Sequence, residues 1–252
     1  MATKERLDSI EEMVISEKKV TVSKLSEKFD VTEETIRRDL EKLEEKGLIV
    51  RTYGGAILNI ENKSEGIPFY KRAGINLESK QFIALKALEF IKRGTTLITD
   101  SSSTVIEVLK LIKDRTDLTI ITNSIEALHE LNQSDLNILS TGGAFNKNSL
   151  SLQGLVAKNT IKNYHVEIAL VSCKGMDKIN GIMDSSDEEA EIKKQMIEQA
   201  NIVILLIDHT KFDKTSLVKL FNFSDIDYII TDVEPRAEWI EFLNSSNIKI
   251  LY

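Results

Sequence analysis

Cysteine, histidine and tryptophan are scarce in this chain of 252 residues. The one cysteine, Cys173, excludes an internal disulfide framework and is typical of a protein in a reducing cytosol. Cys173 ends an apolar run, so we expect a buried thiol rather than a reactive one. The three histidines, at positions 129, 165 and 209, lack the spacing of metal ligands. The sequence therefore predicts no metal site, and nothing in it calls for a cofactor.

Long apolar runs are also missing. No stretch approaches the ~20 consecutive apolar residues that a membrane-spanning helix needs. The N-terminus is charged from Lys4 onward and lacks the apolar core of a signal peptide. With 42% hydrophobic and 29% charged residues, the composition is typical of a soluble globular protein. We therefore expect a cytoplasmic protein with no membrane partner.

An excess of positive charge is absent as well. The formal net charge is −7, and residues 1–58 hold 11 Lys and Arg against 13 Asp and Glu. This balance argues mildly against a nucleic-acid-binding protein. Any DNA binding must then depend on a local patch and on more than one copy per assembly, and it should weaken strongly with salt. The patch would consist of Arg37, Arg38, Lys42 and Arg51.

Residues 21–55 have the pattern of two short helices, a tight turn and a strand pair. In the second helix Ile36, Leu40 and Leu43 recur at i, i+4 and i+7 and so share one buried face. Arg38 then points away from that face, with Thr35 and Lys42 on the same outer stripe and Arg37 on its flank. Gly54 and Gly55 mark the tip of a β-wing. This order of elements places a helix in the major groove of DNA.

The arginines on the outer face suit DNA recognition, because a guanidinium can donate two hydrogen bonds to a guanine edge or bind a phosphate. Glutamates crowd the second half of the helix, so we expect Thr35 to Arg38 to read bases, with Lys42 beside them. Arg51 and Tyr53 of the wing would hold the DNA backbone. An ordinary α-helical hairpin with solvated charges fits the same spacing, since such patterns are degenerate.

From residue 79 onward apolar strands alternate with helices, which predicts a mainly parallel sheet covered on both faces. We therefore predict three parts: a winged helix-turn-helix domain at 1–58, a linker at 59–78 and an α/β effector-sensing domain at 79–252. The linker assignment follows from its polar character and from Gly66, Pro68 and Gly74.

Polar loops follow several predicted strands, and ligands bind at this edge of a parallel sheet. One loop opens a helix with four hydroxyls, which together with free N–H groups make an anion cradle. A small phosphorylated polyol suits such a set. Each loop also has a purely structural interpretation as a helix cap or turn. The candidate residues are Asp100, Ser101, Ser102, Ser103, Thr104, Thr122, Asn123, Ser124, Gly142, Gly143, Asp208 and Lys211.

The motifs resemble those of DeoR-family bacterial transcriptional regulators. In the N-terminal part the resemblance is carried by the run Thr35 to Leu40, by Leu43, by Gly47-Leu48, by Arg51 and by Gly54 to Ala56. In the second part it is carried by Asp100–Thr104, Thr122–Ser124, Gly142-Gly143, Gly175–Asp177 with Gly181, Glu189-Ala190 with Lys193, Asp208 with Lys211, and Thr231-Asp232. Three departures are Tyr53, where the family usually has histidine, Ser102, where it usually has glycine, and Ser103, where it usually has threonine.

The resemblance implies a sensor domain similar to ribose-5-phosphate isomerase and CoA-transferase folds, which binds a phosphorylated sugar. It adds Lys174, Gly175, Glu189 and Lys193 to the expected effector site. It also implies operator DNA as a partner, a homodimer or homotetramer, and repression of genes for sugar uptake or catabolism.

Two alternatives stay open. One is an activator. The other is a sugar-phosphate isomerase with a non-functional winged module, in which Asp100, Glu189 or Asp208 would be the base and Lys193 or Lys211 would polarise a carbonyl. Because a sensor must not consume its signal, the sequence favours a protein without catalytic residues.

Overall fold

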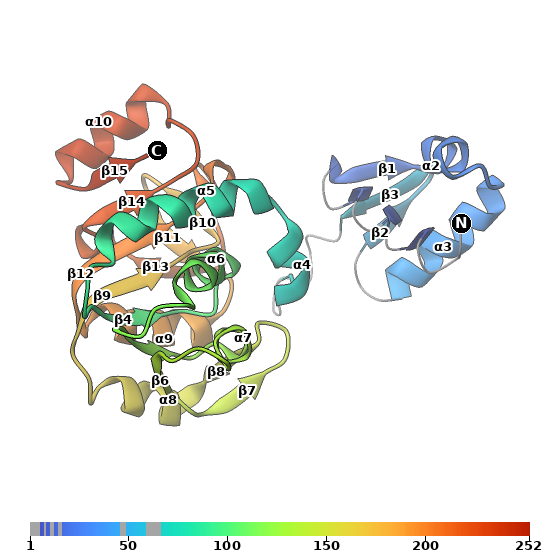
Figure 1. Cartoon of the computed structure of the whole chain (residues 1–252). Coiled ribbons are helices and arrows are strands. Elements are labelled where there is room, and N and C mark those ends of the chain that lie inside the picture. The colour runs from blue at the N-terminus through green and yellow to red at the C-terminus, as the bar shows by residue number, and fades with distance from the viewer. Residues whose placement is uncertain (1–5, 8, 11–12, 15–16, 46–48, 59–66) are drawn as a thin grey trace. The chain divides into compact units, whose positions relative to one another are not determined.

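The computed structural model describes residues 6–7, 9–10, 13–14, 17–45, 49–58 and 67–252 of the chain (Figure 1). The chain divides into two compact units, Met1–Lys63 and Ser64–Tyr252. None of the described helices is both long enough and apolar enough to cross a membrane.

The first unit contains the predicted helix-turn-helix. Helix α2 (Val22–Phe29) begins after Thr21, whose side chain accepts a hydrogen bond from the Lys24 amide, and ends at Asp30 in the left-handed conformation. Helix α3 (Glu33–Glu45) follows directly, and the Thr32 hydroxyl accepts from the Thr35 amide at 3.3 Å. Thr32 therefore caps the N-terminus of the second helix.

The wing is a hairpin of β2 (Ile49–Thr52) and β3 (Gly55–Leu58), with Arg51 opposite Ala56. A third strand, β1 (Lys19–Thr21), pairs with β3 and was not predicted. Gly55 is required at this crossing, because a Cβ there would lie 1.9 Å from the Val20 carbonyl oxygen.

The small core of this unit joins the helices to the wing. Leu25, Ile36, Leu40 and Leu43 are at most 1% exposed, which confirms the predicted inner face of α3. Asp39 is buried on the same helix and accepts a hydrogen bond from Arg6 Nε at 2.7 Å. This ion pair fixes α3 to the helical segment that contains Arg6, so the outer face of α3 is held in place.

The second unit is built on a parallel sheet of seven strands, in the order β15-β14-β12-β9-β4-β5-β6, and the predicted parallel α/β architecture is confirmed. The strands are β4 (Thr96–Thr99), β5 (Thr119–Thr122), β6 (Asn137–Ser140), β9 (Val166–Val171), β12 (Ala200–Leu206), β14 (Tyr228–Ile230) and β15 (Lys249–Leu251).

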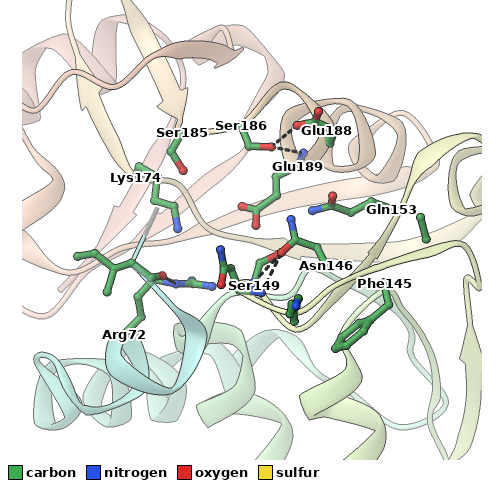
Figure 2. Close-up of a pocket in the computed structure, with 14 residues that line it drawn as sticks. Arg72, Phe145, Asn146, Ser149, Gln153, Lys174, Ser185, Ser186, Glu188 and Glu189 are labelled. Atoms are coloured by element: carbon green, nitrogen blue, oxygen red, sulfur yellow. Dashed lines mark hydrogen bonds between the residues drawn. The ribbon is translucent and has the colours of Figure 1, made fainter. Parts of the chain in front are cut away.

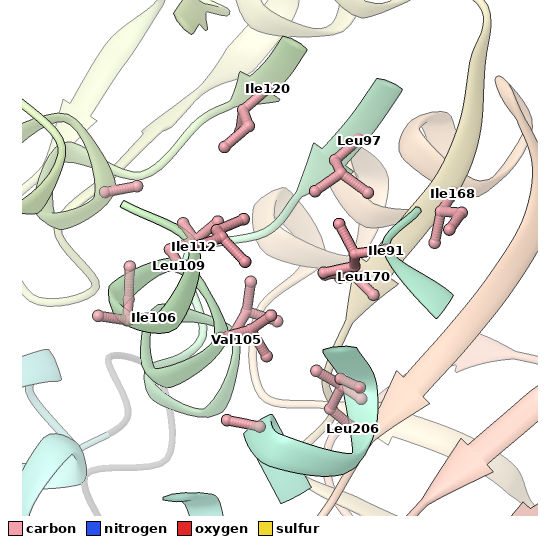
Figure 3. Close-up of a cluster of buried hydrophobic side chains, with 14 of the residues drawn as sticks. Ile91, Leu97, Val105, Ile106, Leu109, Ile112, Ile120, Ile168, Leu170 and Leu206 are labelled. Carbon is pink, nitrogen blue, oxygen red and sulfur yellow. The ribbon is translucent and has the colours of Figure 1, made fainter. Parts of the chain in front are cut away.

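Helices cover both faces of this sheet because neighbouring residues of each strand point to opposite sides. Leu97 faces α4 (Phe69–Gly74), α5 (Leu77–Ala87), α6 (Ser103–Ile112) and α7 (Ile125–Glu130), as Figure 3 shows in part. Ile98 faces α8 (Gly154–Ile161) and α9 (Asp187–Ile197). Beside them, α10 (Ala237–Ser245) packs Trp239 and Leu243 on the same face.

Two smaller antiparallel sheets were not predicted. One joins β10 (Gly175–Asp177), β11 (Gly181–Asp184) and β13 (Val218–Phe221), and the other pairs β7 (Ala144–Asn146) with β8 (Ser151–Gln153). Short 3-10 turns lie at Leu88–Phe90, His209–Lys211 and Phe223–Asp225.

The predicted linker also differs from the structure. Its residues 59–66 lie outside the described part, but residues 69–74 form α4, and α5 begins at Leu77, before the predicted end of the linker at residue 78. Phe69 is 3% exposed and belongs to the core under α6, so this segment is packed onto the second unit.

Candidate functional site

The outer face of α3 presents the side chains that the sequence predicts for DNA contact. Arg37, Arg38 and Lys42 are exposed, whereas Thr35 is half-buried and shares a hydrogen bond of 2.9 Å with Thr32. At the wing tip Tyr53 is fully exposed. The structure thus brings the predicted arginines, lysine and wing residues to one unit with their polar groups accessible.

Carboxylates accompany the arginines of this surface. Arg37 pairs with Glu33 at 2.6 Å, and Arg38 pairs with Glu34 at 3.6 Å, each within one turn of α3. Because these side chains are exposed, each pair stabilises the fold by only about 0–1 kcal/mol. DNA phosphates can therefore replace the carboxylates at little cost to the fold.

The wing is fixed to α3 by Glu44. Its carboxylate accepts from the Arg51 amide at 2.9 Å and pairs with the Arg51 guanidinium at 3.5 Å. A cavity of about 250 Å³ lies between helix and wing, and its lining includes Arg37, Arg51 and Tyr53. These contacts set the angle at which the wing stands beside the recognition helix.

In the second unit, Asp100 and Lys193 meet in a buried ion network with Asp184. The Lys193 ammonium lies 2.7 Å from Asp184 and 3.2 Å from Asp100, and it also donates to the Ser172 carbonyl at 2.8 Å. Burial lowers the pKa of Lys193, but the two aspartates raise it more, so the ammonium stays charged. Both predicted effector residues are thus already bonded within the protein.

The loop after β4, which carries four hydroxyls, leads into the first turn of α6, and Ser101 to Thr104 are all buried. The Ser102 hydroxyl caps α6 by accepting from the Val105 amide at 3.4 Å. Ser102 has φ −77°, so this position needs no glycine, and the departure from the family pattern strains nothing. The Ser103 hydroxyl donates to the Arg72 carbonyl of α4 at 3.5 Å.

The next two loops are also bonded internally. The Thr122 hydroxyl donates to the Thr99 carbonyl, Ser124 caps α7, and the Asn123 amide donates to the Leu152 carbonyl at 3.1 Å. Among the described side chains, Asn123 Oδ1 is one of two buried polar atoms without a partner. Gly142 and Gly143 have φ +63° and +116°, and a Cβ on Gly143 would lie 2.4 Å from the Gln153 carbonyl.

Asp208 and Lys211 lie at the end of β12. The Asp208 carboxylate accepts from Asn76 Nδ2 at 3.2 Å and from the Thr210 amide at 3.0 Å, with Lys211 at 3.8 Å. Asp208 therefore joins the loop before α5 to the sheet edge.

A cavity of about 630 Å³ opens beside these loops, and Figure 2 shows its lining. It is lined by Ile67, Arg72, Ala144, Phe145, Asn146, Lys147, Asn148, Ser149, Gln153, Lys174, Ser185, Ser186, Glu188 and Glu189. Of the predicted effector residues only Lys174 and Glu189 are in this set. The others lie outside this lining, and several of them bond within the protein, as Asp100 does with Lys193 and Asp208 with Lys211.

Most residues of this lining are not among those predicted from the sequence. Arg72 lies in the segment predicted as linker, Asn146 ends the unpredicted strand β7, and Lys147 to Ser149 lie in the turn between β7 and β8. The polar run after Gly142-Gly143 and the pair Ser185-Ser186 were the available signals, since both follow residues of the family motifs.

Lys174 is the unusual member of the lining. It is half-buried, and no described residue forms a hydrogen bond or ion pair with its ammonium. The pKa of Lys174 is lowered to about 8, first because burial disfavours the charge and next because Arg72 lies nearby. Glu189 and Asp184 oppose this shift, and Lys193 adds to it.

Within the described part of the chain, one group of side chains is close enough together to hold a metal ion. Ligand atoms of Glu126, His129 and Glu130 on α7 lie within 4.8 Å of one another. Lys110 lies 4.0 Å from Glu130 and supplies a competing positive charge. Elsewhere, Cys173 is buried as expected, and burial raises the pKa of its thiol to about 12.

A winged helix-turn-helix joined to a parallel α/β unit with a polar cavity defines a DNA-binding regulator with a ligand-sensing domain. The family model described as DeoR-like helix-turn-helix domain matches residues 6–62, and that described as DeoR C terminal sensor domain matches residues 75–233. The chain belongs to the DeoR family of transcriptional regulators.

Curated relatives agree with this assignment along nearly the whole chain. The uncharacterised HTH-type transcriptional regulator YulB of Bacillus subtilis is 38% identical over 99% of this chain and 96% of its own length. The L-fucose operon activator of Haemophilus influenzae is 36% identical over 85% and 86%. The glycerol-3-phosphate regulon repressor of Escherichia coli is 29% identical over 99% of both chains.

Among solved structures, a ribose 5-phosphate isomerase A from Methanocaldococcus jannaschii aligns with a TM-score of 0.42 and 17% identity. This alignment covers 54% of this chain and 55% of that one.

Proposed function

We propose that the protein represses genes for the uptake or catabolism of a sugar and that a phosphorylated sugar controls it from the cavity. The observation that carries the effector class is the half-buried Lys174, which has no hydrogen-bond or ion-pair partner among the described residues and shares the cavity with Arg72 and with amides and hydroxyls. Cations bind phosphate, while amides and carboxylates bind sugar hydroxyls. Relatives named for L-fucose and glycerol-3-phosphate genes support a carbohydrate-derived signal.

The proposed DNA site is the outer face of α3, with Arg37 and Arg38 as base-reading residues. Lys42, Arg51 and Tyr53 would bind phosphates, and Thr35 would support the N-terminal half of the helix. One such site offers few cations, so we propose a homodimer or homotetramer that binds paired half-sites in the bacterial cytoplasm. Effector binding would change the spacing of the paired DNA-binding domains. The size of this effect would depend on how much more tightly the effector binds one conformation of the protein than the other.

Residues 1–58 would bind DNA, residues 59–66 would connect the units, and the remainder would sense the effector. The predicted effector residues outside the cavity lining would act by shaping the loops that surround it.

The first experiment tests whether the protein represses or activates its target genes. If the protein is a repressor, deleting its gene should raise the transcript levels of the neighbouring genes, which are measured directly. A fall would support an activator, as the name of the L-fucose operon relative indicates for that protein.

Catalysis is the second candidate function, because Glu189 offers a carboxylate in the cavity. The other candidate base near it, Asp100, is bound to Lys193 and to two backbone amides, which favours a structural role. We propose that the protein is not an enzyme. Steady turnover of ribose 5-phosphate or a hexose phosphate by the purified chain would contradict this.

A further inference from the structure

Helix α4 is the first described helix after residues 59–66, and its last turn is hydrogen-bonded to α5 and α6. The Arg72 carbonyl accepts hydrogen bonds from the Lys80 ammonium and from the Ser103 hydroxyl. Lys80 is 4% exposed and forms no ion pair with a described carboxylate. A buried ammonium held mainly by a neutral carbonyl is costly, and its pKa is lowered to about 8, mainly by burial.

The side chain of Arg72 points the other way, into the cavity. Its Nε donates to the Ile67 carbonyl at 3.0 Å, and its guanidinium lies 5.5 Å from the centre of the Phe69 ring. No described carboxylate pairs with it. Arg72 is therefore joined to the buried loop through its carbonyl and to the cavity through its guanidinium.

Two cations that form no ion pair with a described carboxylate thus face one cavity, which Glu189 also lines. Figure 2 shows the Lys174 ammonium and the Glu189 carboxylate turned towards the space in which the Arg72 side chain ends. Like charges so placed disfavour each other unless an anion lies between them. A phosphate monoester carries nearly two negative charges and can accept from both groups, whereas a neutral sugar cannot.

We propose that the effector's phosphate bridges Lys174 and the Arg72 guanidinium, and that this contact acts on α4. The proposal rests on the proposed function, in which an anionic effector fills this cavity. A phosphate that takes the guanidinium competes with the bond from Arg72 Nε to the Ile67 carbonyl. Residues 67–72 come shortly after the first unit, which ends at Lys63. The backbone path of residues 67–72 therefore changes when the effector binds. Arg72 is the positioning residue through which the cavity acts on this path.

The test uses the full chain with a fluorescent reporter on α4. In Tyr70→Cys the new thiol replaces an exposed side chain, whereas Cys173 is buried with a raised pKa, so one site reacts with an environment-sensitive dye. Inorganic phosphate, ribose 5-phosphate, glucose 6-phosphate and fructose 6-phosphate are titrated beside the free sugars. Calorimetry on the unlabelled protein measures affinity independently of the dye.

We expect at least one phosphorylated compound to bind and to change the dye signal, and the free sugars to do neither. Lys174→Met should weaken binding about tenfold or more, because it removes a charged hydrogen bond. Lys162→Met removes the same charge from an exposed position at the end of α8 and should stay within about twofold. Arg72→Lys keeps a positive charge but loses Nε, so phosphate should still bind while the dye response falls.

Several outcomes would overturn the proposal. Unchanged affinity in Lys174→Met, or no binding by any phosphorylated compound, removes the phosphate subsite. Binding by calorimetry without a dye response in the Tyr70→Cys protein, or a full response in Arg72→Lys, removes the coupling through α4. Operator binding is measured separately, so its absence would refute the proposed regulation while leaving the subsite result intact.

Discussion

Replacing Arg38 by alanine separates DNA recognition from folding in the recognition helix. The Arg38 side chain is 73% exposed, and its nearest carboxylate, Glu34, lies 3.6 Å away and is 63% exposed. An exposed pair of this kind contributes about 0–1 kcal/mol, so the free energy of unfolding should change by less than ~1 kcal/mol. A guanidinium that reads a base edge contributes about 1–3 kcal/mol of discrimination. Operator affinity should therefore fall about 5- to 150-fold for each recognition helix that binds.

The assay is fluorescence anisotropy on operator DNA, with denaturant unfolding of the same preparations. Arg93→Ala is the matched control, because Arg93 is an exposed arginine of the sensing unit. Its operator affinity should equal that of the unmodified protein. Unchanged DNA binding by Arg38→Ala, or loss of the folded state, would refute the assignment of the outer face.

Three further predictions concern the core, the ion network and pH. Leu40→Ala should lower the free energy of unfolding by about 2–5 kcal/mol, since Leu40 is 1% exposed and leaves a cavity; a loss below ~1 kcal/mol in denaturant titrations would contradict this packing. Lys193→Met leaves Asp100 and Asp184 buried without their cation and should cost about 3–5 kcal/mol at neutral pH, again measured by unfolding. Phosphate affinity should fall as pH rises through about 8, because Lys174 is charged below this pKa and neutral above it, while the phosphate stays ionised. Calorimetry between pH 7.5 and 9.5 checks the slope, which should vanish in Lys174→Met.

The sequence predicted the elements whose residues repeat with a clear period. The inner face of α3 follows from Ile36, Leu40 and Leu43, and the apolar strands of the large sheet follow from runs such as that of β12. The strands β7, β8 and β10 have only three residues each, too few to show an alternation of polar and apolar side chains. Helix α4 was hidden by Pro68 and Gly74 at its ends.

The candidate site was predicted only in part, for a physical reason. Polar residues at strand ends can bond either a ligand or one another, and sequence does not distinguish these cases. Asp100 and Lys193 bond each other at 3.2 Å, whereas Lys174 has no described partner and faces the cavity. Arg72 was missed because its place beside the cavity depends on the packing of Phe69 into the core.

The most direct test of the account is a mobility-shift assay of the purified chain on the DNA upstream of its own gene. It is run at two salt concentrations, with and without a panel of hexose and pentose phosphates. We expect specific binding that weakens with salt and is released by one phosphorylated sugar but not by the free sugar. Specific binding that no sugar phosphate alters would contradict the proposed effector class. No binding at either salt concentration would contradict the proposal that the protein regulates transcription from this DNA.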